Sequence, residues 1–525
     1  MQFRNFLRPP SEAERFGAGI KGGNDRMRQL MSGVAKQLSM PYPWKGAGTS
    51  GRKSWENPRI PSGYTYLAQL VAHDCVFTSV PTGALCPFAG HTSRRSSLLR
   101  LETIYGLGPD SEPDAYLAHG ANYGARSRLA IGGPYARHSE KGLYLFRDVG
   151  RATVAPDESA AQLADARNDI HAALAQLTTL FILLHNRIAA DVEAVLAGES
   201  LPNVVIRGYR IYFISRMLCE HIYRDVIRHD LLPRILHPAV VTVYEQPSFE
   251  LVDQPGGEAL PIEFVSVLRF GHAMVRHSYV FNDLNSYGED LIDMMLSTSA
   301  ARPWRMPLDE TWMAQWSYFF DMGGEHGPNL SRRIGPEFSG GLFSGEIFGP
   351  IDQTGSVGLG YRDLLSGAFV GLWSVSALAD EIRVRKPELA GLSPLLRDDE
   401  LRIRRLREWL ASYAMSNGLS GSDIDDLARD PPLFLYVLFE AAYEMEGERL
   451  GVLASLVLAE TLYGALRGMC SDRHAAIDAA CMIALGHAHG AARFERCMPN
   501  ICTMADLIHF VGQGMDQEKV AIPFV

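Results

Sequence analysis

The sequence predicts a mainly α protein that folds as one large helical domain with few short strands. Apolar residues recur at helical spacing over three long segments, 158–197, 205–236 and 448–469, whereas strand-like runs are few. No fixed-period repeat, low-complexity tract or clear linker divides the chain. With 525 residues, of which 47% are hydrophobic and 21% charged, the chain can bury the large core that such a domain requires.

The first 65 residues differ in composition from the rest of the chain. They are rich in glycine, proline and charged residues, so we expect residues 1–65 to form an irregular arm over the surface and residues 66–525 to form the helical domain. The glycine-rich segment 339–360 is expected to be a long loop. It lacks the strand–turn–helix setting and the Lys-Ser/Thr ending of a phosphate-binding loop.

Charge and cysteine content narrow the partners and the location. A net charge of −10 argues against nucleic-acid binding, because a phosphate backbone requires a dense basic patch. The seven cysteines are scattered without metal-ligand spacing, so we expect free thiols. We also expect no membrane span and a cytoplasmic location, because no uninterrupted apolar run of about 18 residues and no secretory signal is present.

The stretch YLAQLVAHDCVF, residues 66–77, carries polar side chains in apolar surroundings. Gln69 and His73 are four residues apart and share one face of a helix, while Asp74 is rotated by about 100°. Two interpretations remain open for the histidine. It is either a buried side chain satisfied by a backbone carbonyl or a group that takes part in chemistry.

Three further places combine chemically able side chains with apolar neighbours. Arg167 stands at the head of a long apolar helix, His272 lies within VLRFGHAMV, and Asp363 follows Arg362 within GYRDLLSGAF. A histidine with a carboxylate partner is typical of catalysis or metal binding, since the carboxylate fixes the tautomer and raises the basicity of the imidazole. Each motif alone is a weak signal.

Taken in chain order, the motifs resemble those of the animal-type haem peroxidase superfamily in its bacterial branch, which is related to myeloperoxidase, cyclooxygenase and the fatty-acid dioxygenases. The resemblance runs from about residue 60 to residue 512 and implies a mainly α haem-peroxidase domain that binds haem b. The matching pieces are Gln-x-x-x-His-Asp at 69–74, Arg-Asn-Asp at 167–169, LHNRIA at 184–189, RFGH at 269–272 and Arg-polar-Leu-Leu at 362–365.

The resemblance implies a role for each residue. His73 looks like the distal histidine that takes a proton from peroxide, with Gln69 on the same helical face, and Arg167 looks like the cation that stabilises the departing oxygen. His272 looks like the axial ligand of the haem iron. Asp363 stands where the family usually has the asparagine that holds the other nitrogen of this ligand.

A carboxylate in place of that asparagine would push the imidazole toward imidazolate and lower the reduction potential of the iron. An ion pair of Asp363 with Arg362 or with another neighbour is the alternative for this carboxylate.

Other positions depart from the family. Mammalian members attach haem through ester bonds at two places that hold Ala72 and Ile170 here, so we expect haem to be bound without a covalent link. Asp169 is the neighbour of the second place and is a candidate haem contact. His171 follows where myeloperoxidase has its haem-linked methionine, and both a haem-edge role and a simple hydrogen-bonded histidine remain open.

Calcium is not expected. Asp74 matches a calcium ligand of secreted family members, but Arg100 occupies the place of another acidic ligand, and a guanidinium cannot ligate a cation. We therefore expect a salt bridge between Asp74 and Arg100.

The expected function is that of a haem-dependent peroxidase. It would use hydrogen peroxide to oxidise a small organic, aromatic metabolite, in bacterial specialised metabolism. In the dioxygenases a tyrosine three residues before the axial histidine becomes the reactive radical, and Arg269 stands there and is expected at the haem pocket. A fatty-acid dioxygenase and a non-catalytic haem-binding protein remain the alternatives.

Overall fold

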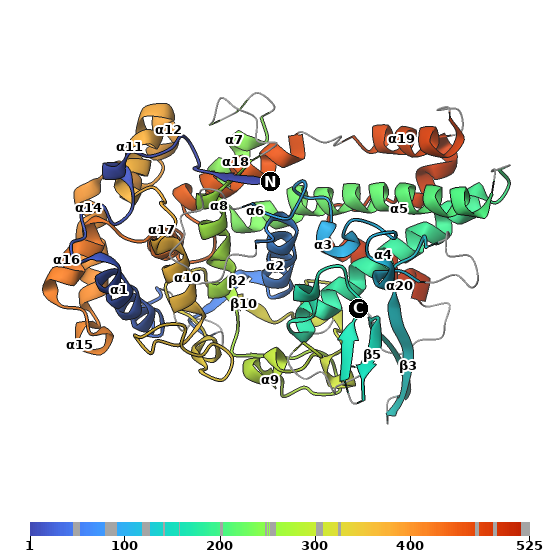
Figure 1. Ribbon diagram of the computed structural model, residues 1–525, viewed down its shortest axis with the longest axis horizontal. Helices are drawn as coiled ribbons and strands as arrows, with labels where there is room; N and C mark the ends of the chain where they lie inside the picture. Colours follow the sequence, from blue (N-terminus) through green and yellow to red (C-terminus); the bar gives the residue numbers. More distant parts are fainter. Residues whose placement is uncertain are drawn as a thin grey trace.

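The computed structural model is dominated by helices, and its strands are short, which confirms the mainly α prediction (Figure 1). It describes residues 1–45, 53–78, 92–117, 126–139, 142–156, 158–199, 203–246, 249, 251, 259–300, 308–323, 327–467, 472–486 and 491–515.

The α-helices are α1 (Gly23–Leu38), α2 (Gly63–Cys75), α3 (Glu102–Tyr105), α4 (Ala172–Leu196), α5 (Val204–Val226), α6 (Leu232–Ile235), α7 (Pro238–Tyr244), α8 (Ile262–Val267), α9 (Leu291–Met295), α10 (Leu359–Ala368), α11 (Val375–Arg385), α12 (Pro387–Ala390), α13 (Pro394–Arg397), α14 (Asp399–Ala411), α15 (Ala414–Asn417), α16 (Gly421–Arg429), α17 (Leu433–Met445), α18 (Val452–Arg467), α19 (Arg473–Leu485) and α20 (Met504–Met515). The 3₁₀ turns are η1 (Glu12–Glu14), η2 (Pro113–Ala115), η3 (Ala166–Asp169), η5 (Leu268–Met274), η6 (Glu310–Trp312), η7 (Trp316–Tyr318), η8 (Gly340–Phe343) and η9 (Ala491–Cys497), and the π-helical turn η4 (Ile227–Leu231) joins α5 to α6.

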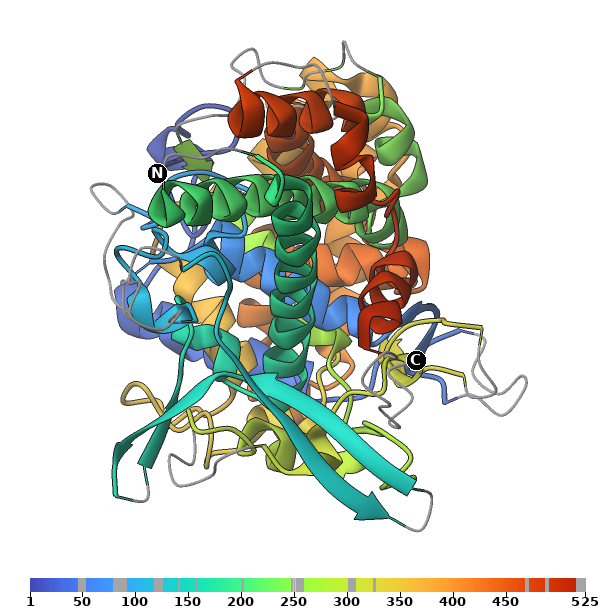
Figure 2. The same ribbon diagram turned by 90° about the vertical axis from the view of Figure 1, so that its right-hand side faces the viewer.

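The strands form two-stranded sheets. β1 and β7 are parallel, and the other pairs are antiparallel. Two hairpins, β3–β4 and β5–β6, project from the helical body at the bottom of Figure 2. The pairs are β1 (Gln2–Arg4) with β7 (Ala259–Pro261), β2 (Glu56–Pro61) with β10 (Leu330–Arg332), β3 (Ile131–Ser139) with β4 (Gly142–Val149), β5 (Arg151–Ala155) with β6 (Glu158–Ala161), and β8 (Ser278–Tyr279) with β9 (Glu289–Asp290).

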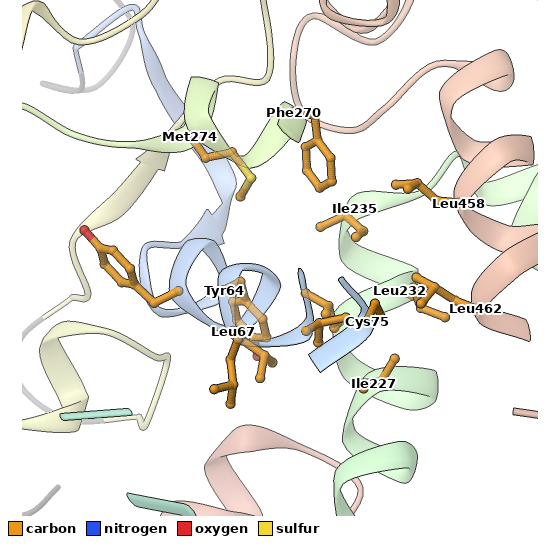
Figure 3. Close-up of a cluster of buried hydrophobic side chains, with 14 of the residues drawn as sticks. Tyr64, Leu67, Cys75, Ile227, Leu232, Ile235, Phe270, Met274, Leu458 and Leu462 are labelled. Atoms are coloured by element: carbon orange, nitrogen blue, oxygen red, sulfur yellow. The ribbon is translucent and has the colours of Figure 1, made fainter. Parts of the chain in front are cut away.

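Helix α2 lies at the centre of the body and presents two different faces (Figure 1). Its inner face packs on η4, α6, η5 and α18, where the side chains of Figure 3 point toward one another. Tyr64, Leu67 and Cys75 belong to this buried face, and Gln69 and His73 belong to the other. Burying an apolar side chain of this size contributes about 1.5–3 kcal/mol, so this packing fixes which way the polar face points.

Helix α4 is apolar on almost every side. It is long and apolar enough to cross a membrane by length and composition, but 83% of its most apolar stretch is buried inside the protein. A helix that is hydrophobic all round is typical of a protein core. It crosses α5 in Figure 2, and Arg167 and His171 stand at its N-terminal end.

The N-terminal arm is more ordered than we expected. Residues 23–38 form the regular helix α1, which buries Met27, Leu30, Val34 and Leu38 against α10 and α15. The glycines before the helix and the charged residues on its outer face concealed its apolar period in the sequence. The expectation of an irregular arm is therefore wrong for this segment.

Two smaller expectations can also be compared with the structure. Apart from the short turn η8, segment 339–360 is a loop until α10 begins at Leu359. The five cysteines within the described residues are free thiols, and Cys86 and Cys470 lie outside those residues.

The start of α2 provides a test of this packing. A Cβ atom at Gly63 would lie 2.5 Å from the carbonyl oxygen of Phe319 and from the ring of Phe320, whereas a Cβ at Gly464 in α18 would meet nothing within 4 Å. Gly63→Ala should lower the free energy of unfolding by about 1–3 kcal/mol, and the control Gly464→Ala should raise it by about 0.5–1 kcal/mol. Denaturant unfolding measures both, and equal effects would contradict the packing of α2.

Candidate functional site

A cavity of about 450 Å³ lies between α2 and η3 on one side and η5 and α10 on the other. Most of its lining is apolar, and it includes Ala72 and Ile170. The polar groups come from opposite walls. The predicted site residues that line it are Gln69, His73, Arg167 and His171 on the α2 side and Arg269 and His272 on the η5 side.

Hydrogen bonds fix the tautomer of His73. Asn168 donates from its side-chain nitrogen to the carbonyl oxygen of Thr103 (3.1 Å), and its oxygen accepts from the Thr103 hydroxyl (3.2 Å). The same oxygen lies 3.0 Å from Nδ1 of His73, so Nδ1 carries the proton and donates. Nε2 is left with its lone pair and can act as a base.

His73 is neutral at ordinary pH. Burial lowers its pKa to about 4, and the nearby positive charge of Arg167 contributes to the same shift. The bond to Asn168 opposes this shift but does not overcome it. A neutral imidazole with a free Nε2 is the form that can accept a proton.

Arg167 is held by four of its five N–H groups. Nε and one N–H of Nη2 donate to the carboxylate of Asp165 at 3.0 and 2.7 Å. The other groups donate to the backbone carbonyls of His73 (3.0 Å) and Val76 (2.9 Å). Within the described residues one N–H of Nη1 has no partner, and the side chain lines the cavity. The guanidinium also lies over the ring of Phe77, 4.4 Å from its centroid.

His272 faces this group from the opposite wall. Its Nδ1 lies 2.7 Å from Oδ2 of the buried Asp363, the partner that the family resemblance implied, so Nδ1 donates. Nε2 has no partner among the described residues and could bind a metal. Arg362 donates instead to the carbonyl of Gly349, so the alternative pairing with this arginine is wrong. Another neighbour takes its place, because Nη1 of Arg269 lies 3.9 Å from Oδ1 of Asp363. Arg269 donates to the backbone carbonyl of Asp363 at 3.3 Å.

The η5 turn separates its core residues from its cavity residues. Phe270 and Met274 are buried in the cluster of Figure 3, while Arg269 and His272, three residues apart, line the cavity. A 3₁₀ turn has three residues per turn, so residues at this spacing share a face.

His171 and Gln69 form a second hydrogen-bonded pair. Nδ1 of His171 accepts from the backbone N–H of Leu174 (3.2 Å), so Nε2 carries the proton and donates to Oε1 of Gln69 (3.0 Å). Burial lowers the pKa of His171 to about 3, which keeps it neutral. Its partners are therefore a backbone amide and a side-chain amide, while a haem-edge role stays a prediction.

Asp169 does not line the cavity. It makes two hydrogen bonds to Arg151, both at 2.8 Å, and accepts a further one from Ser299 (2.8 Å). Because the turn η3 places successive residues about 120° apart, Ile170 faces the cavity and Asp169 faces this buried ion pair. The placement gives Asp169 a structural role instead of the predicted contact with haem.

The predicted salt bridge between Asp74 and Arg100 is wrong. Asp74 is fully buried and accepts hydrogen bonds from the backbone N–H groups of Leu101 (3.0 Å) and Thr103 (3.2 Å). Arg100 lies instead near Glu220, at 3.6 Å. The orphan donors at the start of α3 satisfy the carboxylate, and burial raises its pKa to about 6.

Three residues of the site were not found from the sequence. Asn168 belongs to a motif that we quoted, but only its contact with His73 reveals its role. Arg95 contacts Asp165 and also donates to the backbone carbonyl of His73. The chain therefore brings Arg95 back to the end of α2. No local pattern signals such a contact, because 22 residues separate Arg95 from His73.

A comparison with protein families matches the middle part of the chain. Residues 101–344 match the family model of the animal haem peroxidases, which confirms the resemblance. This match contains Arg167 and His272, whereas His73 and Asp363 lie outside it. No curated protein sequence matches the chain significantly.

Solved structures share the fold at low sequence identity. Peroxidase A from Dictyostelium discoideum is 13% identical, with a TM-score of 0.51 over 97% of this chain and 95% of that chain. Fatty acid alpha-dioxygenases from Arabidopsis thaliana and Oryza sativa are 12% and 11% identical, each with a TM-score of 0.57. The alignment with the Arabidopsis enzyme covers 94% of this chain and 76% of that chain. The alignment with the Oryza enzyme covers 99% of this chain and 86% of that chain.

The bond between His73 and Asn168 can be tested by substitution. Asn168→Asp places a carboxylate beside Nδ1 and should raise the pKa of His73 by roughly one to three units, because a negative charge stabilises imidazolium. NMR titration of labelled histidine rings measures it. The exposed control Asn500→Asp should leave it unchanged, and the same result for Asn168→Asp would refute the assigned contact.

Proposed function

We propose that the protein is a haem-dependent peroxidase that uses hydrogen peroxide to oxidise a small organic, aromatic molecule. The match of residues 101–344 to the animal haem peroxidase family model supports this proposal. The observation that carries this proposal is the pair of histidines on opposite walls of one cavity. His73 presents a basic Nε2, and His272 presents a metal-binding Nε2 backed by Asp363.

The residues of the cavity fit haem. Apolar side chains such as Val265, Leu268 and Phe348 would offer packing surface to a flat macrocycle, and Nε2 of His272 would be available to bind its iron. The cavity volume is within the usual range for a small-molecule or cofactor site. Ala72 and Ile170 cannot form esters, and no carboxylate is present among the described lining residues, which supports haem b held without a covalent bond.

When bound, haem supplies an iron that coordinates peroxide and takes up its oxidising equivalents. The residues of the chain then do three things. Nε2 of His73 takes a proton from hydrogen peroxide and returns it to the departing oxygen. The remaining N–H of Arg167 stabilises the negative charge on that oxygen. Asp363 accepts the hydrogen bond of His272 and holds its ring in one orientation.

Arg269 supports a peroxidase over a fatty-acid dioxygenase. It stands three residues before His272, where the dioxygenases have the tyrosine that forms their radical, and a guanidinium cannot be oxidised in this way. The fold itself does not separate the two activities, because solved structures of both share it. A cytoplasmic location is part of the proposal and is supported by the scattered cysteines.

Steady-state kinetics test the activity. The haem-loaded protein should oxidise a phenol with hydrogen peroxide well above the rate of free haemin. His73→Ala should lower the rate constant for peroxide by roughly 10²-fold to 10⁴-fold, while the exposed control His509→Ala should not. Oxygen uptake with linoleate would support the dioxygenase instead, and a rate equal to that of haemin would support a non-catalytic haem protein.

The axial assignment has a test that does not depend on turnover. His272→Ala should purify with little haem, because one axial bond and packing must hold the cofactor. Asp363→Asn should keep haem and raise its reduction potential by roughly 60 mV, the equivalent of about one ordinary hydrogen bond for one electron. Full haem occupancy in His272→Ala, or an unchanged potential in Asp363→Asn, would overturn the assignment.

A further inference from the structure

Two arginines share one buried carboxylate behind the distal wall of the cavity. Asp165 is 1% exposed and accepts from Arg167 and, through a short contact with Nη2, from Arg95. The side chain of Arg95 is 6% exposed, whereas that of Arg167 is 32% exposed. Two guanidinium groups and one carboxylate leave this cluster with a net charge of +1.

The same two arginines close the end of α2. The last carbonyls of a helix have no partner within the helix. The carbonyl of His73 is one of them, and it accepts from Nε of Arg95 (2.9 Å) and from Nη2 of Arg167 (3.0 Å). Both cations therefore lie where the helix dipole is negative, and both hold the backbone of the residue that carries the base.

Arg95 does not reach the reacting groups. It is absent from the lining of the cavity, and within the described residues its side chain makes its hydrogen bonds to Asp165 and to the backbone of His73. It also lies over the ring of Phe77, 5.1 Å from the centroid, on the same aromatic side chain as Arg167.

We propose that Arg95 is a positioning residue of the distal site. It neutralises Asp165, so that Arg167 keeps its positive charge toward the cavity. It also fixes the end of α2 beneath His73. This rests on the proposed function for its consequence in peroxide chemistry. Without Arg95, Arg167 would be the one remaining cation paired with Asp165 among the described residues, and the pair would be electrically neutral.

Arg95 should influence His73 through its charge, which acts on the pKa of the imidazole, as well as through the position of the backbone that it holds. Arg95 and Arg167 both lower the pKa of His73, and Asp165 raises it. A group whose folded pKa is lowered stays unprotonated as the pH falls, so His73 remains a base in mildly acidic solution. Loss of Arg95 moves the protonation of His73 to higher pH.

Other titratable groups face α2 from the elements that pack on it, and each has its own partners. On η3 and at the head of α4, Asp169 pairs with Arg151 and His171 with Gln69. Across the cavity, on η5, lie His272 and Arg269, both in contact with Asp363.

Four more of these groups lie on α3, η4, β2 and β10, which also pack on α2. They are Glu102 on α3, bonded to the backbone of Ser96, Asp230 on η4, paired with Arg234, Glu56 on β2, paired with Arg276, and Arg332 on β10, paired with Glu337. None of the partners is Arg95, so its removal changes the surroundings of His73 through Asp165 and Arg167.

The chain offers a matched control in the neighbouring residue. Arg94 is exposed and lies over the same ring of Phe77 at 5.1 Å, but it has no contact with Asp165 or His73 among the interactions of the described residues. Arg94→Met and Arg95→Met remove the same charge one residue apart. Arg95→Lys keeps the charge and loses the two-directional hydrogen bonding of the guanidinium.

The measurement is the pH dependence of cyanide association with the haem-loaded full chain, because hydrogen cyanide must give its proton to the distal base as it binds. We expect the acid limb of the pH profile of Arg95→Met to lie roughly one pH unit above that of the wild type. The plateau of its association rate constant should be lower by at least about tenfold. Arg95→Lys should keep the wild-type limb with a reduced plateau, and Arg94→Met should match the wild type.

Coincident profiles for Arg95→Met and Arg94→Met would overturn the proposal. If Arg95→Met does not retain haem, Arg95→Lys decides, because a wild-type plateau in that variant rules out a positioning role. Cyanide binding does not require turnover, so a wild type without peroxidase activity leaves this test intact. If the wild type binds no haem, the proposed function fails, and NMR titration of His73 in the same chains tests Arg95 by the direction of its pKa change.

Discussion

The hydrogen bonds that hold the polar side chains around α2 determine which of their atoms are left to face the cavity. A buried donor or acceptor without a partner costs about 1–3 kcal/mol, which favours the contacts that Asn168, His73 and His171 make. The carbonyl of Thr103 orients Asn168, Asn168 sets the tautomer of His73, and the backbone of Leu174 sets the tautomer of His171. The base at Nε2 of His73 is thus a consequence of bonds made on the far side of its ring.

A buried carboxylate also sets the distribution of charge on each wall of the cavity. Asp165 and Asp363 are both buried carboxylates, and each accepts hydrogen bonds from the residue whose reactivity it controls. Asp165 is shared between two arginines, which leaves a cation near His73, whereas Asp363 belongs mainly to His272 and makes that imidazole more electron-rich. One wall therefore carries a positive charge toward the cavity, and the other presents an electron-rich imidazole.

The helical parts of the site could be predicted from the sequence because they depend on local periodicity, whereas the pairing of His272 with Asp363 was implied by the family resemblance. The shared face of Gln69 and His73 and the place of Arg167 before α4 follow from helical spacing. The contacts of Asp74 and Arg100 could not be predicted, because the carboxylate is satisfied by backbone N–H groups of α3, and no residue pattern marks these donors. Arg95 was missed for a similar reason, since its partners are a backbone carbonyl and a carboxylate distant in the chain.

The two walls of the cavity come from distant parts of the chain, one from residues 65–171 and the other from residues 265–370. His73 and His272, the two histidines of the proposed mechanism, come from different walls. The binding pocket is therefore completed only by long-range contacts, which form slowly because the entropy of closing a long loop opposes them. A cofactor that binds only the completed pocket stabilises the native fold by mass action. The melting temperature of the chain would then rise with the concentration of that cofactor in its surroundings.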